Sequence, residues 1–125
     1  MTKQSHKDSA IEFLTLAASG RVEEAYARLV GPGFRHHNPY FRGDAASLKE
    51  AMQANATKNP DKLLEVQRAL QDGAQVAVFS RVRQHPNDLG GAVVHIFRFE
   101  GNRIAEFWDI GQAVPENSVN ENGMF

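Results

Sequence analysis

The chain has 125 residues, 42% of them hydrophobic, with 14 basic and 15 acidic residues and no cysteine. This length suits a single domain, residues 1–125, whose core needs no disulfide or metal to hold it. The balanced charge gives no excess for binding nucleic acid, and the missing cysteines exclude disulfides, thiolate nucleophiles and cysteine metal sites. No apolar run has the length of a signal-peptide core or a membrane span, so we predict a cytoplasmic protein that binds neither membrane nor nucleic acid.

Three segments of the first half have apolar residues at the spacing of an amphipathic helix. Gly20 is placed to end the first, and the "GPG" at 31–33 stops the second. Asp44 is a typical N-cap for the third, which must end before Pro60. The predicted helices therefore cover residues 9–18, 22–30 and 45–59.

From Leu63 onward the pattern changes to an alternation rich in Val, Ile and Phe, interrupted by the turn sequences "QDG", "HPNDLGG" and "EGN". This pattern predicts four antiparallel strands. Three helices followed by such strands are typical of the α+β class, with the helices packed on one face of a curved sheet. The ending "PENSVNENGMF" is expected to be a tail that must dock to be ordered. The predicted strands cover residues 63–71, 74–84, 91–99 and 103–113.

The last predicted hairpin carries His95 in "VVHIFRFE" and Asp109 in "IAEFWDIGQ". If Asp109 faces inward, among Phe97, Phe107 and Trp108, its carboxylate loses hydration. Its pKa would then rise from the reference of about 3.9 toward that of a useful general base. The alternative is that Asp109 is an exposed aspartate at the end of a strand. A perturbed pKa inferred from sequence indicates a functional site only in a probabilistic sense.

Whether these two side chains can cooperate depends on the turn in "EGN". A two-residue turn at Gly101-Asn102 pairs Glu100 with Arg103, and an uninterrupted ladder then puts His95 and Asp109 on opposite faces. A three-residue loop with Asn102 in the left-handed conformation pairs Phe99 with Arg103 and puts both on one face. We favour the second arrangement because asparagine tolerates that conformation, although the local sequence leaves both open.

The adjacent histidines His36 and His37 lie in a loop or a short edge strand, where neighbouring side chains diverge, so normally only one can point into a cavity. We choose His37, which precedes Asn38-Pro39, as the candidate site residue. The alternative is a surface or structural histidine. No spacing of histidines and carboxylates matches an HxH or HExxH ligand pair, so no metal site is predicted.

Three stretches, "RHHNPYFRGD", "HIFRFEGNRIAEFWDIGQAVPE" and "NENGMF", together resemble the SnoaL-like proteins. These belong to the nuclear transport factor 2-like superfamily, which also holds ketosteroid isomerases and small polyketide cyclases. The likeness covers nearly the whole chain. It implies a cone in which three helices close over a strongly curved, mainly antiparallel sheet with an apolar pocket inside, and often a homodimer built through the sheet.

The resemblance also implies roles for single residues. In the polyketide cyclase branch an aspartate on the last strand is the acid/base of an intramolecular aldol condensation, with a histidine on the neighbouring strand close by. Asp109 and His95 resemble these positions, and His37 matches the histidine of the family's "HNP" segment. This chain departs from many relatives at two positions, because they carry an acid in place of His95 and a histidine in place of Phe107 in "EFWD".

These arguments predict a small enzyme without a cofactor that binds a hydrophobic carbonyl compound and catalyses aldol-type, cyclase or isomerase-type proton transfer. Asp109 would be the base, with His95 or His37 as the hydrogen-bond donor. The alternatives are a noncatalytic protein that binds a small molecule and a dimeric interaction module. Strand alternation turns Trp108 away from the pocket if Asp109 faces in. The predicted substrate-binding residues are Tyr40, Phe41, Met52, Phe97, Phe107, Trp108 and, as a neutral hydrogen-bonding group, Gln112.

Overall fold

The computed structural model describes residues 4–125, which form three helices and a five-stranded sheet. The strand order is β1-β5-β4-β3-β2, with β1 parallel to β5 and every other pair antiparallel. The predicted α+β class and the three predicted helices are confirmed. The elements are α1 (His6–Ala18), α2 (Val22–Leu29), β1 (Val30–His36), α3 (Ala45–Lys58), β2 (Leu63–Asp72), β3 (Gln75–Arg83), β4 (Gly91–Glu100) and β5 (Arg103–Ala113).

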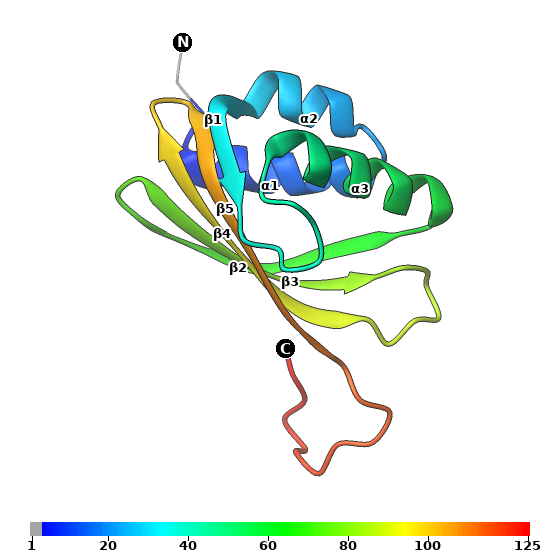
Figure 1. Ribbon diagram of the computed structural model, residues 1–125. Coiled ribbons are helices and arrows are strands. Elements are labelled where there is room, and N and C mark those ends of the chain that lie inside the picture. The colour runs from blue at the N-terminus through cyan, green and yellow to red at the C-terminus, as the bar shows by residue number, and fades with distance from the viewer. Residues whose placement is uncertain (1–3) are drawn as a thin grey trace.

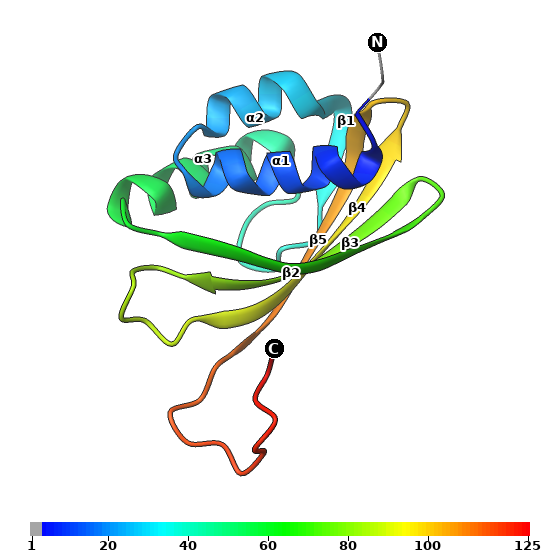
Figure 2. The same ribbon diagram turned by 180° about the vertical axis from the view of Figure 1, so that it is seen from behind.

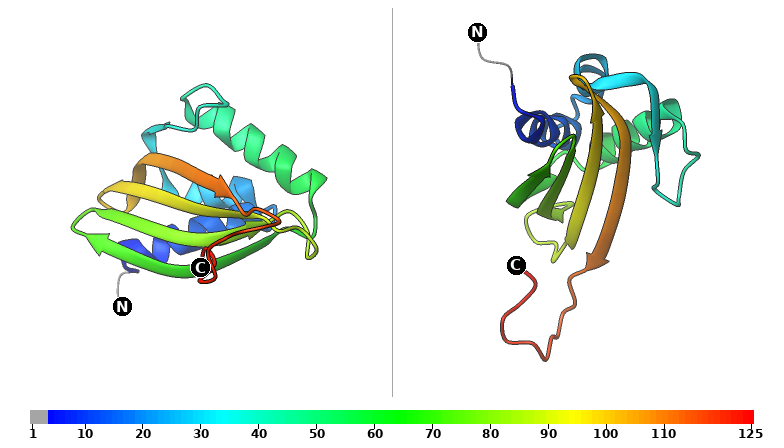
Figure 3. Two further views of the ribbon diagram at one scale, coloured as in Figure 1. Left: turned by 90° about the horizontal axis from the view of Figure 1, so that it is seen from below. Right: turned by 90° about the vertical axis from the view of Figure 1, so that its left-hand side faces the viewer.

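All three helices lie on one face of the curved sheet, and this concave face holds the core (Figures 1 and 2). The views from below and from the side show how strongly the strands bend (Figure 3). At the centre the ring of Phe13 on α1 lies 5.9 Å from Phe97 and 5.8 Å from Phe107. All three are fully buried, and such aromatic side chains supply much of the hydrophobic stabilisation of a core. The edge strands β1 and β2 do not pair with each other, so the sheet stays open.

The helix boundaries follow their capping residues. Asp44 caps α3 as predicted, because its side chain accepts a hydrogen bond of 3.0 Å from the backbone N–H of Ser47. Ser5 does the same for α1 by accepting from the N–H of Asp8, also at 3.0 Å. None of the helices in the part of the chain that the structure describes is both long and apolar enough to span a membrane.

For the segment after α2 the sequence leaves open a loop or a short edge strand at His36 and His37, and the structure shows the edge strand. This strand is β1, whose end pairs Arg35 with Glu106 and His36 with Phe107 of β5. The pairing is irregular between Val30 and Arg35, where the segment contains Gly-Pro-Gly. The residues of β5 that pair with β1 lie about seventy positions further along the chain, so the local sequence does not predict where this strand begins.

The β4–β5 hairpin corrects the predicted register. Glu100 pairs with Arg103 across a two-residue Gly101-Asn102 turn, so the predicted three-residue loop is wrong. Gly101 has φ +59°, as the first central residue of a type II′ turn requires, and no non-glycine residue of the described chain has positive φ. The bulge lies on β5 instead, at Ala105, because Phe99 pairs with Ile104 but Arg98 pairs with Glu106.

This bulge restores the alignment that the predicted loop would have produced. Beyond Ala105, Phe97 pairs with Phe107 and His95 lies directly opposite Asp109. Directly paired residues of an antiparallel sheet point to the same face. His95 and Asp109 therefore share the concave face, as predicted, but for a different reason.

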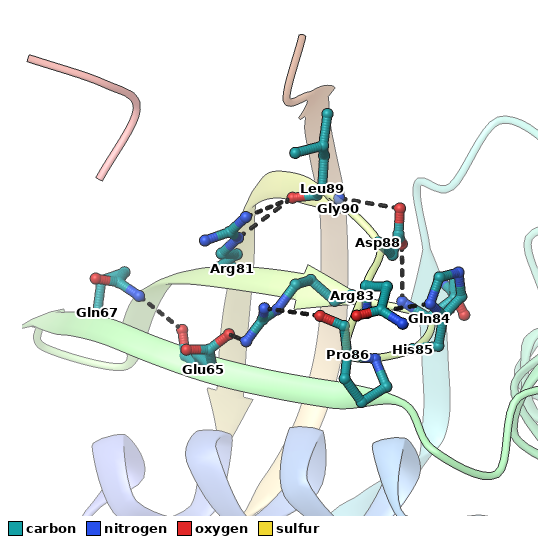
Figure 4. A network of polar contacts seen from close by, with 11 residues as sticks. Glu65, Gln67, Arg81, Arg83, Gln84, His85, Pro86, Asp88, Leu89 and Gly90 are labelled. Atoms are coloured by element: carbon teal, nitrogen blue, oxygen red, sulfur yellow. Dashed lines mark hydrogen bonds and ion pairs between the residues drawn. The ribbon is translucent and has the colours of Figure 1, made fainter. Parts of the chain in front are cut away.

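The β3–β4 loop is tied to β2 and β3 by polar contacts (Figure 4). The Asp88 carboxylate accepts the backbone N–H of Gln84 at 2.9 Å and of Gly90 at 3.1 Å. Arg83 donates both to the Pro86 carbonyl of the loop, at 3.3 Å, and to Glu65 of β2, at 2.5 Å. Gly90 has φ +82°, and a Cβ there would overlap the carbonyl oxygen of Val82, so only glycine fits without rearrangement. These contacts fix the position of Gln84 at the end of β3.

The C-terminal tail docks through its last residue, as the sequence led us to expect. Phe125 stacks on Phe79 with ring centroids 5.8 Å apart, and the guanidinium of Arg81 lies 5.3 Å from the Phe125 ring centroid. Figures 1 and 2 show the tail leaving β5, looping away and returning toward the sheet. The neighbours of Phe79 and Arg81 on β3, Val78 and Ser80, are fully buried, so the tail covers the convex face.

Candidate functional site

A pocket of about 280 Å³ lies between α1, α3 and the concave face of the sheet. Most of its wall is apolar, and a small group of polar side chains converges on it, which is the usual make-up of a small-molecule site. The apolar wall includes Leu14, Leu48, Met52, Leu64, Val82 and Val93. The polar residues are Asn38, Asn55, Lys62, Gln84, His95 and Asp109.

His95 and Asp109 face each other across the β4–β5 ladder at this pocket. His95 Nε2 lies 3.4 Å from Asp109 Oδ1, within the distance of an ion pair. The His95 ring stacks on Phe107, with centroids 5.4 Å apart, and its side chain is 10% exposed against 27% for Asp109. Both side chains line the pocket, and the Asp109 carboxylate is the more exposed of the two.

Burial lowers the pKa of His95, the Asp109 carboxylate opposes this shift, and the Lys62 charge adds to it. The imidazole is therefore neutral near pH 7 and carries one N–H. With an ionised Asp109 the proton belongs on Nε2, because a bare Nε2 would point its lone pair at the carboxylate. His95 Nδ1 is then a buried acceptor with no hydrogen-bond partner among the residues that the structure describes.

Asn38 holds the other carboxylate oxygen. Its Nδ2 donates to Asp109 Oδ2 at 3.0 Å, and its Oδ1 accepts the backbone N–H of Tyr40 at 3.0 Å. The second bond fixes which end of the amide faces the carboxylate, since only a nitrogen can donate to Asp109. Each oxygen of Asp109 thus has one neighbour that restricts its orientation.

The two adjacent histidines exchange the roles expected of them. His36 points inward, is 5% exposed, and is held by the backbone: Nδ1 accepts from Asn38 N–H at 3.1 Å and Nε2 contacts the Arg42 carbonyl at 2.5 Å. His37 points to the convex face, so its predicted place in the pocket is wrong. The cause is the β1–β5 register, which pairs His36 with the inward residue Phe107.

On the convex face His37 joins a network around Glu106, which is only 6% exposed. Glu106 Oε2 lies 2.6 Å from His37 Nε2 and 3.1 Å from Arg35 Nε, and Oε1 lies 3.2 Å from Arg98 Nε. These hydrogen bonds, that to His37 first, lower the pKa of Glu106 to about 2. His37 also stacks on Trp108, 4.9 Å between centroids. The network fastens the end of β1 to β5 next to Asn38.

The other predicted wall residues divide between the pocket, the core and the surface. Phe41 and Met52 line the pocket. Phe97 and Phe107 are fully buried beneath it, so they support the floor without lining it. Tyr40 is 85% exposed. Five predictions of pocket contact are thus wrong: Phe97 and Phe107 lie in the core, Trp108 and Gln112 lie on the convex face, and Tyr40 points into solvent. For Trp108 this agrees with the strand alternation that turns it away when Asp109 faces in.

Four polar pocket residues were not predicted from the sequence: Asn38, Asn55, Lys62 and Gln84. Asn38 had a usable signal, because an asparagine before proline commonly folds its side chain back on the turn. Lys62 follows the break between α3 and β2 and has no distinctive pattern around it. Within residues 4–125 no group of three or more histidine and carboxylate side chains is arranged to hold a metal ion.

The fold is similar to that of a nuclear transport factor 2-like protein from Cytophaga hutchinsonii, which is 16% identical with a TM-score of 0.70 over 89% of this chain and 93% of the other. The model of the SnoaL-like domain family matches residues 10–107, and the chain belongs to this family. No curated protein has a matching sequence.

Solved structures agree on the fold at low sequence identity. A candidate polyketide cyclase from Acidithiobacillus ferrooxidans is 20% identical with a TM-score of 0.68, over 90% of this chain and 92% of the other. A candidate isomerase of the SnoaL-like family from Agrobacterium tumefaciens is 11% identical with a TM-score of 0.70, over 88% and 100%. AclR, a candidate hydroxylase from Streptomyces galilaeus, is 18% identical with a TM-score of 0.71, over 86% and 88%.

Proposed function

We propose that the pocket binds a small hydrophobic carbonyl compound and that Asp109 moves a proton at the carbon next to the carbonyl, in an aldol-type, cyclase or isomerase-type reaction. One observation carries this proposal. A single carboxylate faces an apolar-walled pocket and is oriented at both oxygens, by Asn38 Nδ2 at 3.0 Å and His95 Nε2 at 3.4 Å. A base held in one orientation can meet a C–H bond without first reorganising.

The proton transfer needs only groups of the chain. Asp109 accepts the proton from the substrate, the C–H bond breaks, and its electron pair moves toward the carbonyl oxygen to form an enolate. The enolate carbon then attacks a second carbonyl group, and the alkoxide that forms takes the proton from Asp109. In an isomerase-type reaction of an unsaturated ketone, Asp109 instead returns the proton to a different carbon of the conjugated dienolate. Neutral His95, whose Nε2 lies 3.4 Å from Asp109 Oδ1, stays next to the carboxylate through both steps.

The names of the similar structures support this reaction class, since they include a candidate cyclase and a candidate isomerase. They also include a candidate hydroxylase, so the fold does not select one chemistry. A homodimer through the sheet and a cytoplasmic location remain predictions. Light scattering of the purified chain tests the first, and fractionation of the source cells tests the second.

The test is hydrogen exchange of enolisable ketones in D2O, followed by proton NMR. Acetophenone, cyclohexanone and tetralone serve as probes of a size suited to the pocket. Wild-type protein should accelerate exchange at the carbon next to the carbonyl, and Asp109→Asn should reduce this acceleration about 100-fold or more. Asp72→Asn, at an exposed strand end, is the matched control and should exchange at the wild-type rate.

Ketone binding, measured by NMR line broadening on the same samples, distinguishes a catalytic pocket from one that only binds a ligand. Binding that survives in Asp109→Asn while exchange is lost supports a catalytic carboxylate. Exchange at the wild-type rate in Asp109→Asn contradicts the assignment. Binding without any exchange, equal in both proteins, would favour a noncatalytic protein that binds the same class of ligand.

A further inference from the structure

Lys62 brings a cationic side chain into the pocket from the segment just before β2. Its Nζ donates to Asn55 Oδ1 on α3 at 2.7 Å. Asn55 is itself held, because its backbone carbonyl accepts both the N–H and the side-chain Nδ2 of Asn59 at 2.9 Å. The ammonium is therefore fixed at one side of the pocket by the C-terminal end of a helix.

The charges of the pocket act on one another. Burial lowers the pKa of the Lys62 ammonium, and attraction by the Asp109 carboxylate opposes this shift. The Lys62 charge in turn helps to lower the pKa of His95. Yet among the residues that the structure describes, Lys62 forms no ion pair, because no carboxylate oxygen lies within 4.0 Å of its Nζ.

An ammonium has three N–H donors, and Asn55 accepts one of them. A partly desolvated cation gains from a further acceptor, and a ligand in the pocket is in a position to supply it. Lys62 and Asp109 both line the cavity and form no ion pair with each other, so a ligand in the cavity can contact both. A carbonyl group placed there would present its oxygen to Lys62 and its neighbouring C–H to Asp109.

We propose that Lys62, held by Asn55, binds the carbonyl oxygen of an uncharged, enolisable substrate and stabilises the enolate that forms when Asp109 removes the proton. This inference rests on the proposed function. It adds the group that stabilises the enolate oxygen, which is Lys62, and the charge of the substrate. The C–H bond breaks, an O–H bond forms on Asp109, and the negative charge moves from Asp109 to the oxygen beside Lys62. The interaction with Lys62 is therefore stronger after the transfer than before it, which is what accelerates a reaction.

The charge balance selects the substrate class. The pocket lining holds one lysine, Lys62, and one aspartate, Asp109, whose opposite charges balance before the reaction. An uncharged ketone or ester keeps this balance, whereas a carboxylic acid would bring a second negative charge next to Asp109. The pocket should accordingly favour a negative charge on the oxygen that faces Lys62 and disfavour one elsewhere on the ligand, close to Asp109.

The test uses para-nitrophenol, whose phenolate resembles an enolate and absorbs visible light, and para-nitroanisole, its uncharged methyl ether of similar shape. Wild-type protein should bind the phenolate at least about 10-fold more tightly than the ether, because of a charge-assisted hydrogen bond. Lys62→Met should lose this preference, and Lys62→Arg, which keeps the charge, should retain part of it. Lys58→Met, at the exposed end of α3, is the matched control and should bind as the wild type does.

Two further outcomes separate this inference from the role of Asp109. Asp109→Asn should bind the phenolate more tightly than the wild type, because a repelling charge is gone, whether or not Asp109 is a catalytic base. If Lys62→Met keeps the preference, or the wild type has none, the inference is overturned. Reduction with borohydride in the presence of para-nitrobenzaldehyde, followed by peptide mass analysis, gives an independent check. Selective covalent labelling of Lys62 would mean a nucleophilic amine and would also overturn it.

Discussion

Glu106 allows a quantitative test of how the edge strand β1 is held. Its carboxylate contacts His37, Arg35 and Arg98, and its pKa falls from 4.5 to about 2. At about 1.4 kcal/mol per pKa unit, this shift sets an upper limit of about 3 kcal/mol on the stability that the charge contributes. The Arg35 side chain is 67% exposed, so water screens part of the attraction. We expect Glu106→Gln to lower the free energy of unfolding at pH 7 by about 1–2 kcal/mol.

The stability that the Glu106 carboxylate contributes should decrease as the pH falls. A carboxylate with a lowered pKa in the folded state contributes its full stabilisation above the unfolded-state pKa near 4.5, and loses it as the pH falls toward 2. The stability difference between wild type and Glu106→Gln should therefore be complete at pH 7. At pH 3 more than half of it should be gone.

Urea unfolding, followed by the fluorescence of Trp108, the only tryptophan, measures the stability difference between wild type and Glu106→Gln at pH 7 and at pH 3. Glu100→Gln is the matched control, because Glu100 also pairs with Arg98 but its side chain is 72% exposed. It should change the stability by less than about 0.5 kcal/mol. A Glu106→Gln effect that is absent at pH 7, or equally large at pH 3, would refute the reasoning.

Two further predictions concern backbone geometry. Gly90→Ala should lower the free energy of unfolding by about 2 kcal/mol or more, because the new Cβ overlaps a strand carbonyl and the backbone has a positive φ. Gly73→Ala should lower it by only about 1 kcal/mol, because φ is also positive there but no atom lies within 4 Å of the new Cβ. Urea unfolding of both variants checks the difference, and equal losses would contradict it. Deletion of Ala105 should cost about 3 kcal/mol or more, because without the bulge either Ile104 or Phe107, both fully buried, must turn outward. An unchanged urea midpoint for the deletion would show that the hairpin adapts without this cost.

Local sequence was sufficient for the helices and four of the strands. Asp44 caps α3 as predicted, and the alternation after Leu63 marks β2 to β5 to within a few residues. These features depend on short-range periodicity and on hydrogen bonds between residues three or four apart, so the chain carries them in contiguous stretches. The family resemblance then supplied the curved sheet and the pocket, which periodicity alone does not contain.

Local sequence failed where a distant partner decides which way a side chain points. The "HH" pair shows this most clearly, because two neighbouring histidines are equivalent in sequence and opposite in the fold. Pairing of β1 with β5 turns His36 to the core and His37 to Glu106. The same pairing brings Asn38 to Asp109, a contact between residues 71 positions apart.

What the sequence by itself determined is the α+β class, the order of its helices and four of its strands, and the likeness to the SnoaL-like proteins. The tertiary structure alone decided the parallel edge strand, the bulge at Ala105 and the polar lining of the pocket. A one-residue shift at Ala105 sets the face of every later residue on β5, including Asp109. The cost of exposing Ile104 or Phe107 fixes that shift, and such a cost exists only when the whole core is assembled.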